Sequence, residues 1–283
     1  MGDQQEQNET TVLGRRAFLG AIGAGVLAAR LANAEAAVSD EPAWSFAVVA
    51  DPHLREDRQG EPTGVAKFQQ VLARLEALRP RPEFALLLGD IHPEKLAPLL
   101  PEIAVPLRPV MGNHEGAPQR KQLRELFPEE FAGRDYYAFT HRECLFLGLC
   151  TATPTDHIGH FESEFITPGT GQCAWLEAQL AAGQRHRHCF LFGHIPPERL
   201  CRPDGMCLAQ NDARFLHALV RQHPPTALFF GHRHAAISFD FGGAPLYGVR
   251  SCNWNFNKEP TGFLHVLLGG PKPEVRFVAA AEG

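Results

Sequence analysis

The stretch WSFAVVADPH, residues 44–53, places seven largely apolar residues directly before an Asp and a His. A short apolar run of this kind, bounded by polar residues, is typical of a strand that is buried on both faces of a sheet. The pattern recurs in FALLLGD, residues 84–90, where the apolar run ends at Gly89-Asp90. Polar side chains that are capable of chemistry therefore stand just after buried strands, where each strand leaves the sheet.

The segments around these two strands predict a βαβαβ unit. Apolar residues recur with a helical period over residues 65–78, and a short helix is expected over residues 94–100. A third strand is expected over residues 106–111. Strands that alternate with helices predict an α/β protein with a parallel sheet and right-handed crossovers.

The rest of the chain adds more strands than helices. Helices are expected over residues 172–182 and 212–222, and the polar stretch 151–170 is expected to be a loop. Strands are expected over residues 136–140, 144–150, 189–193, 227–231, 237–241, 245–249, 263–268 and 274–279. No internal repeat or clear linker follows residue 43, so we expect residues 35–283 to form one domain.

Five short polar motifs follow the predicted strands in order along the chain. They contain the oxygen and imidazole groups that commonly bind metal ions in proteins. The motifs are Asp51-Pro52-His53, Gly89-Asp90, Gly112-Asn113-His114-Glu115, Gly193-His194 and Gly231-His232-Arg233-His234. Because strand ends can converge on one edge of a sheet, we expect these groups to lie together, as a centre of two metal ions requires.

The order of these motifs resembles the calcineurin-like metallophosphoesterase family over roughly residues 46–268. The resemblance implies a four-layer fold, in which two packed mixed β-sheets are flanked by α-helices. It also implies an enzyme that hydrolyses phosphoric esters by attack of a hydroxide that bridges two metal ions. Mixed oxygen and nitrogen donors suit Mn, Fe, Zn or Co, and the sequence leaves the choice among them open.

The resemblance also implies a ligand for each position of the two-metal centre. The first ion would be held by Asp51, His53, Asp90 and His234. The second ion would be held by Asp90, Asn113, His194 and His232. Asp90 is common to both sets because the two oxygens of one carboxylate can each bind a cation. His114 lies outside both sets, and it is the candidate to protonate or stabilise the leaving oxygen or, alternatively, to orient neighbouring groups.

Four residues are candidates for contact with the substrate. They are Asn113, His114, Arg233 and Arg250. Arg233 stands between two predicted ligands and Arg250 follows a predicted strand, so each is either a phosphate clamp or a surface residue. His92, which closely follows Asp90, has the same two interpretations.

The composition is that of a soluble globular protein with a sizeable core, because 44% of the residues are hydrophobic and 21% are charged. The net charge of -5 offers no broad attraction to nucleic acid or to anionic lipid, and no nucleic-acid-binding surface is evident. A small phosphorylated substrate would therefore be attracted locally, by the positive charge of bound metal ions.

The first 34 residues differ from the rest of the chain. Gly14-Arg15-Arg16-Ala17-Phe18-Leu19-Gly20 resembles a twin-arginine export signal, and the apolar stretch 17–29 is too short to span a bilayer. Ala32-Asn33-Ala34 has the small-x-small pattern of a cleavage site. We therefore expect a signal peptide over residues 1–34, the twin-arginine export machinery as a partner, and a periplasmic or extracellular mature protein. An amphipathic N-terminal helix is the alternative.

The seven cysteines are an odd number, so at least one has no partner within the chain. Cys201 and Cys207 flank a turn-rich pentapeptide, and a local disulfide between them is one possibility in an oxidising compartment.

These features together predict an exported phosphoesterase that acts on phosphodiesters or phosphomonoesters. The short spacings and the motifs GNHE and GHRH favour the class that contains cyclic-nucleotide and glycerophosphodiester phosphodiesterases. A phosphomonoesterase of the acid or alkaline phosphatase type is the nearest alternative, and a non-catalytic binding protein on the same fold is another. The HxHxDH motif of binuclear amidohydrolases does not occur in the sequence.

Overall fold

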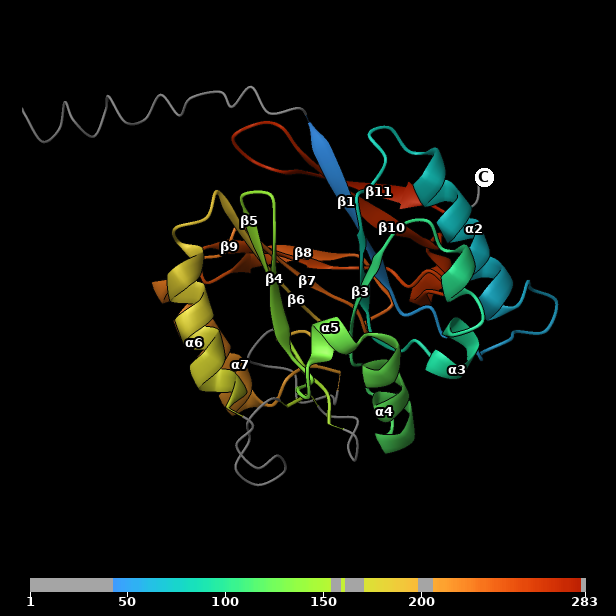
Figure 1. Ribbon diagram of the computed structural model, residues 1–283, viewed down its shortest axis with the longest axis horizontal. Coiled ribbons are helices and arrows are strands. Elements are labelled where there is room, and N and C mark those ends of the chain that lie inside the picture. The colour runs from blue at the N-terminus through green and yellow to red at the C-terminus, as the bar shows by residue number, and fades with distance from the viewer. Residues whose placement is uncertain (1–42, 154–158, 161–170, 198–205, 281–283) are drawn as a thin grey trace, which may run out of the picture. The chain divides into compact units, whose positions relative to one another are not determined.

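The computed structural model describes residues 43–153, 159–160, 171–197 and 206–280, which contain two β-sheets (Figure 1). The strands of the first sheet are β1 Trp44–Ala50, β2 Ala85–Leu88, β3 Leu107–Val110, β10 Gly262–Leu268 and β11 Glu274–Ala279. The strands of the second sheet are β4 Tyr137–His141, β5 Cys144–Gly148, β6 His188–Gly193, β7 Ala227–Phe230, β8 Ile237–Phe241 and β9 Ala244–Gly248.

Both sheets are mixed. The first sheet has the order β11-β10-β1-β2-β3, in which β1, β2 and β3 are parallel and β10 runs antiparallel to β1. The second has the order β4-β5-β6-β7-β9-β8, with a parallel centre and an antiparallel strand at each edge. The predicted parallel βαβαβ unit is therefore confirmed, as is the prediction of two mixed sheets.

The two sheets pack face to face through a layer of aromatic side chains. The ring of Phe46 on β1 is fully buried and lies 5.2 Å from Phe146 and 5.1 Å from Phe190, both on the other sheet. The Phe46–Phe146 pair is edge-to-face, with an interplanar angle of 90°. Aromatic pairs in this arrangement contribute about 0.5–1.5 kcal/mol beyond the burial of their area, so this layer holds the sheets together firmly.

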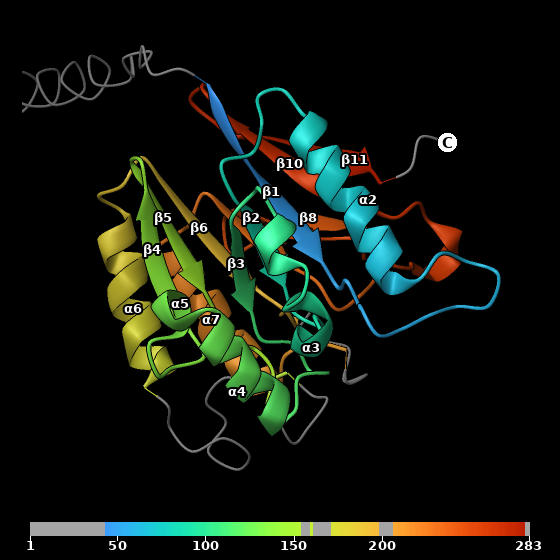
Figure 2. The same cartoon turned by 45° about the vertical axis from the view of Figure 1, so that its right-hand side comes forward.

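The described residues also form six helices. They are α2 Gly64–Ala77, α3 Pro93–Leu96, α4 Ala117–Leu126, α5 Pro128–Phe131, α6 Gln172–Gly183 and α7 Gln210–Gln222, with short 3-10 turns η1 Leu100–Glu102 and η2 Phe256–Lys258. In both views α6 and α7 lie together against the second sheet, and α2 lies against the first (Figure 2). This arrangement confirms the predicted four-layer fold.

Helices α3, α4 and α5 differ from the sequence-based expectation, in which α4 and α5 are absent. The helix expected over residues 94–100 ends at Leu96, because Pro98 lacks the N–H that would continue its hydrogen bonds. Helix α4 was not predicted, because its only buried residues are Arg120 and Leu123 and so no apolar stripe marks it in the sequence.

Several predictions fall on residues outside the described ranges. These are the signal peptide over residues 1–34, most of the loop 151–170, and the pairing of Cys201 with Cys207. They stay predictions, as does the one-domain organisation of residues 35–283. None of the helices in the described ranges combines the length and the apolar character of a membrane-spanning segment.

Candidate metal centre

The predicted ligands follow the carboxyl ends of strands from both sheets. Asp51 comes directly after β1, Asp90 two residues after β2, and Asn113 three residues after β3. His194 comes directly after β6, and His232 two residues after β7. In the first sheet β1, β2 and β3 are parallel to one another, and in the second sheet β6 and β7 are parallel. The carboxyl ends of these strands therefore lie at one edge of each sheet.

The structure gathers these side chains into two buried groups. In each group the potential ligand atoms lie within 4.8 Å of one another. The first group is Asp51, His53 and His234, and the second is Asp90, His194 and His232. Asn113 joins the second group, since its Oδ1 lies 2.9 Å from Nε2 of His194.

Hydrogen bonds to the backbone aim the imidazoles at the centre. Nδ1 of His194 donates to the carbonyl oxygen of Leu88 at 2.7 Å, and Nδ1 of His234 donates to that of Trp254 at 2.8 Å. A carbonyl can only accept a hydrogen bond, so in both rings Nε2 is the nitrogen that is left to face the neighbouring ligands.

The potential ligand atoms of this cluster are better suited to binding cations than to hydrogen bonding with one another. The Nε2 atoms of His53 and His234 lie 3.0 Å apart, and each is also 3.6 Å from a carboxylate oxygen. Nε2 of His232 is buried and has no hydrogen-bond partner among the described residues. Buried polar atoms are nearly always paired, and imidazole with carboxylate is a donor set that suits transition metals.

Charge and burial act on the ionisation of the cluster. Burial alone would raise the pKa of Asp90, but the neighbouring His194 and His53 hold it well below its usual value. Burial, reinforced by His194, lowers the pKa of His232 to about 3, which leaves its ring neutral. The pKa of His194 is instead raised to about 9, because Asp90 outweighs the effect of burial. The carboxylates are thus charged at neutral pH, as metal binding requires.

The backbone at the cluster is strained. Six non-glycine residues there have φ between 42° and 67°, a region of backbone conformation that residues other than glycine rarely adopt. They are Asp51, His53, Asp90, His92, His232 and His234. Such strain costs on the order of 1–3 kcal/mol per residue and is concentrated at functional sites in proteins.

Two motif glycines allow the loops to approach closely. A Cβ atom on Gly89 would lie 2.5 Å from Nδ1 of His194, and one on Gly112 would lie 2.3 Å from the backbone nitrogen of Asp90. Neither position can carry a side chain without moving a ligand. This explains why the GD and GN motifs begin with glycine.

Residues 45–236 match the sequence profile of the calcineurin-like phosphoesterases. This chain belongs to that family. It is therefore a metal-dependent hydrolase of phosphoric esters, and the two groups of buried ligands are where this phosphoesterase can hold metal ions.

Known relatives agree with this assignment. A protein from Rhodopseudomonas palustris, described as a probable cyclic nucleotide phosphodiesterase, is 28% identical over 71% of this chain and 76% of its own length. A glycerophosphodiester phosphodiesterase from Enterobacter lignolyticus is 29% identical over 67% of this chain and 70% of its own length. A dimetal phosphatase from Danio rerio has the same fold, with a TM-score of 0.62 at 17% identity, over 86% of this chain and 98% of the other.

Glu115 anchors two ligand loops of this phosphoesterase to each other. Its buried carboxylate accepts hydrogen bonds from the backbone N–H groups of Asp90 at 3.0 Å, Ile91 at 2.7 Å and Gly112 at 2.7 Å. The loops after β2 and β3 are thereby held at a constant spacing. The GNHE motif contains this residue, but its sequence gives no sign of this structural role.

The residues after β9 brace the loop after β1. The hydroxyl of Ser251 donates to the carbonyl oxygen of Asp51 at 2.8 Å, and Nδ2 of Asn253 donates to that of His53 at 3.0 Å. Arg250, predicted as a substrate contact, pairs with Glu259 at 2.7 Å and lies over the ring of Phe277 at 4.4 Å. The contact of Arg250 with substrate stays a prediction.

His114 lies on the open side of the centre. Its side chain is 41% exposed, its ring lies 5.0 Å from that of His53, and its Nε2 is 3.9 Å from Oδ2 of Asp90. His92 is buried beside it, and its Nε2 has no hydrogen-bond partner in the part of the chain that the structure describes, so the interpretation of His92 as a surface residue is wrong. Arg233 is half-buried between its two histidines, and its contact with substrate stays a prediction.

Glu56 is a residue of the site that the sequence analysis missed. Its Oε1 lies 3.0 Å from Nδ1 of His53, and its Oε2 accepts a hydrogen bond from Nε1 of Trp254 at 3.1 Å. The carboxylate therefore faces the ring nitrogen of His53 that points away from His234. A glutamate three residues after a histidine is too common a pattern to signal this role.

We expect Glu56→Gln to weaken metal binding roughly tenfold, because a carboxylate behind a ligand imidazole orients the ring and increases its basicity. The measurement is the dissociation constant for Zn²⁺, by competition with a chromophoric chelator. Glu76→Gln, which removes a charge on the exposed side of α2, is the matched control and should leave the constant unchanged. Equal constants for Glu56→Gln and the unmodified protein would show that Glu56 does not act on the centre.

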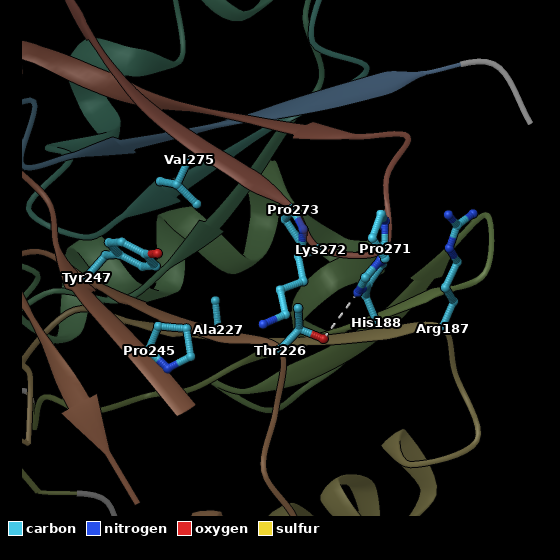
Figure 3. A pocket seen from close by; sticks show the side chains of 10 residues that line it. All are labelled: Arg187, His188, Thr226, Ala227, Pro245, Tyr247, Pro271, Lys272, Pro273 and Val275. Atoms are coloured by element: carbon cyan, nitrogen blue, oxygen red, sulfur yellow. Dashed lines mark hydrogen bonds between the residues drawn. The ribbon is translucent and has the colours of Figure 1, made fainter. Parts of the chain in front are cut away.

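A separate cavity of about 440 Å³ lies away from the predicted ligands (Figure 3). Its lining includes His188, Thr226 and Lys272. His188 and Ala227 begin β6 and β7, whose opposite ends lead to His194 and His232. No predicted ligand or substrate-contact residue lines this cavity.

Proposed function

We propose that this enzyme hydrolyses phosphodiesters at a centre of two transition-metal ions. The observation that carries the proposal is the pair of buried ligand groups, with Asp90 between them and His114 on their open side. The two relatives described as phosphodiesterases support the diester preference. A phosphomonoesterase at the same centre is the alternative.

The proposed ligands are the residues that the two groups contain. Asp51, His53, Asp90 and His234 would hold one ion, and Asp90, Asn113, His194 and His232 the other. When bound, Mn, Fe, Zn or Co ions would supply positive charge for the phosphate and a nucleophile from water at neutral pH. His114 would give a proton to the leaving oxygen, for which its exposed position beside Asp90 is suited. A non-catalytic binding protein would need neither the full set of metal ligands nor a proton donor such as His114 beside them.

We also propose that the protein is exported by the twin-arginine pathway. The support is the sequence around Arg15-Arg16 and the apolar stretch that follows it. Replacing both arginines by lysine should keep the protein in the cytoplasm, whereas the unmodified chain should appear in the periplasmic fraction without residues 1–34. The measurement is immunodetection in cell fractions. Equal export of both chains would remove the twin-arginine assignment.

The experiment that tests the activity pairs metal analysis with two substrates. Metal content of the purified protein is measured first, and then hydrolysis of bis(p-nitrophenyl) phosphate and of p-nitrophenyl phosphate with Mn, Fe, Zn or Co added. We expect two bound ions per chain and metal-dependent turnover that is faster with the diester. Faster turnover of the monoester would select the alternative, and a protein with neither metal nor turnover would contradict the proposal.

A further inference from the structure

An exposed aromatic ring lies beside the metal centre. Among the large apolar side chains that the structure describes, Phe256 and Phe277 are exposed, by 49% and 38%. Phe256 begins the turn η2, and its ring centroid is 6.0 Å from that of His234, a proposed ligand. Scattered exposed apolar residues are ordinary on protein surfaces, so the position of this ring matters more than its exposure.

The ring of Phe256 is held in place from two directions. Its backbone N–H donates to the carbonyl oxygen of His234 at 3.2 Å. Its ring packs edge-to-face on Trp254 at 5.1 Å, with an angle of 82°, and Trp254 is itself bound to Glu56 through Nε1. A ligand that stacks on Phe256 therefore meets a ring that is already ordered, which lowers the entropic cost of binding.

Positive charge accompanies these rings. The guanidinium carbon of Arg58 lies 4.2 Å from the ring centroid of Trp254, which is a cation–π contact. We call the surface formed by Phe256, Trp254 and Arg58 the rim of the site. One oxygen of the neighbouring Glu56 carboxylate accepts the hydrogen bond from Nε1 of Trp254, and Glu61 also lies close enough to Arg58 to interact with its charge. The rim thus combines an apolar face with a cation, which suits a ring that is attached to an anion.

We propose that Phe256 is a binding platform for a flat ring of the substrate, with Trp254 and Arg58 as its support. This inference rests on the proposed function, because it takes the phosphate to lie at the metal centre. A ring joined to that phosphate by a short link then reaches Phe256. The substrates selected in this way are phosphodiesters that carry an aryl or nucleoside group rather than only small alkyl groups.

The test compares two ligands that differ only by a ring. Phenylphosphonate and methylphosphonate carry the same metal-binding group, and their dissociation constants are measured by calorimetry on the metal-loaded protein. Stacking of a base on an aromatic side chain changes affinity roughly 5- to 150-fold, so we expect the unmodified protein to prefer phenylphosphonate. Phe256→Ala should reduce that preference roughly tenfold, and Phe256→Tyr should retain it. The ratio of the two constants cancels any general loss of metal.

Phe277→Ala is the matched control, because Phe277 is an exposed ring on β11 that packs under Arg250 rather than beside the centre. Its ratio should equal that of the unmodified protein. An unmodified protein without preference for phenylphosphonate, an unchanged ratio in Phe256→Ala, or an equal loss in Phe277→Ala would each overturn the platform while leaving the hydrolase intact. A protein that binds neither phosphonate and hydrolyses neither nitrophenyl ester would instead overturn the proposed function.

Discussion

Asp90→Ala should reduce the bound metal from two ions per chain to one or none and lower kcat for bis(p-nitrophenyl) phosphate by about a thousandfold. The carboxylate lies between the two ligand groups: its Oδ2 is 3.3 Å from Nε2 of His194 and 3.6 Å from Nε2 of His53. Its Oδ1 also accepts the backbone N–H of His114 at 3.0 Å. Loss of this side chain therefore removes a shared ligand and a contact that positions His114. Metal content and steady-state kinetics on the same preparation check both effects.

The control for Asp90→Ala is Asp240→Ala, which removes an exposed carboxylate from β8. It should keep both ions and full turnover. If Asp90→Ala also kept two ions, the carboxylate would not be the shared ligand, and the division of ligands between the two ions would have to be redrawn.

His114→Ala should have the opposite combination of effects, with two ions retained and kcat lowered by about 10²–10⁴-fold. The reason is that its side chain lies on the open side of the cluster, 41% exposed, where a leaving group would depart. Geometry alone allows another role, since His114 also belongs to a third group of potential ligand atoms with His53, Glu56 and His92. Metal content therefore decides between an acid and a ligand.

The dependence on the leaving group sharpens this test. A p-nitrophenolate leaves readily without a proton, whereas the more basic phenolate depends more strongly on receiving one as it leaves. The decrease in kcat of His114→Ala should therefore be larger for the phenyl diester than for the p-nitrophenyl diester. His223→Ala, a change at the end of α7, is the control and should alter neither metal content nor this dependence. Loss of one ion in His114→Ala would reassign His114 as a ligand. An equal loss with both leaving groups would indicate a positioning role instead.

Local sequence was sufficient to predict most of the strands. The run WSFAVVA was predicted as a strand with the bounds that β1 has, and FALLL contains β2. The reason is that a strand buried on both faces must be apolar throughout, and a polar motif or a turn residue marks its end. Helix α4 shows the limit of this logic, because a helix that buries a single apolar residue, Leu123, leaves no periodic signal.

The candidate ligands were also readable from the sequence, because each belongs to a short motif at a strand end. The side chains that contact these ligands could not be predicted from the sequence. Glu56 and Trp254 are 198 positions apart, yet they meet beside His53, and Phe256 reaches His234 only through the turn η2. The pairing of Arg250 with Glu259 likewise depends on the fold, and the sequence position of Arg250 does not show it.

The sequence by itself determined the fold class, the order of the strands along the chain, and which residue types would stand at the strand ends. Those properties depend on apolar runs and glycines, which act locally on the backbone. The tertiary structure alone decided which side chains surround the ligands, because the packing of two sheets brings the loop after β1 against the segment after β9. A side chain's direction is set by the neighbours it packs against, and here those neighbours come from distant parts of the chain.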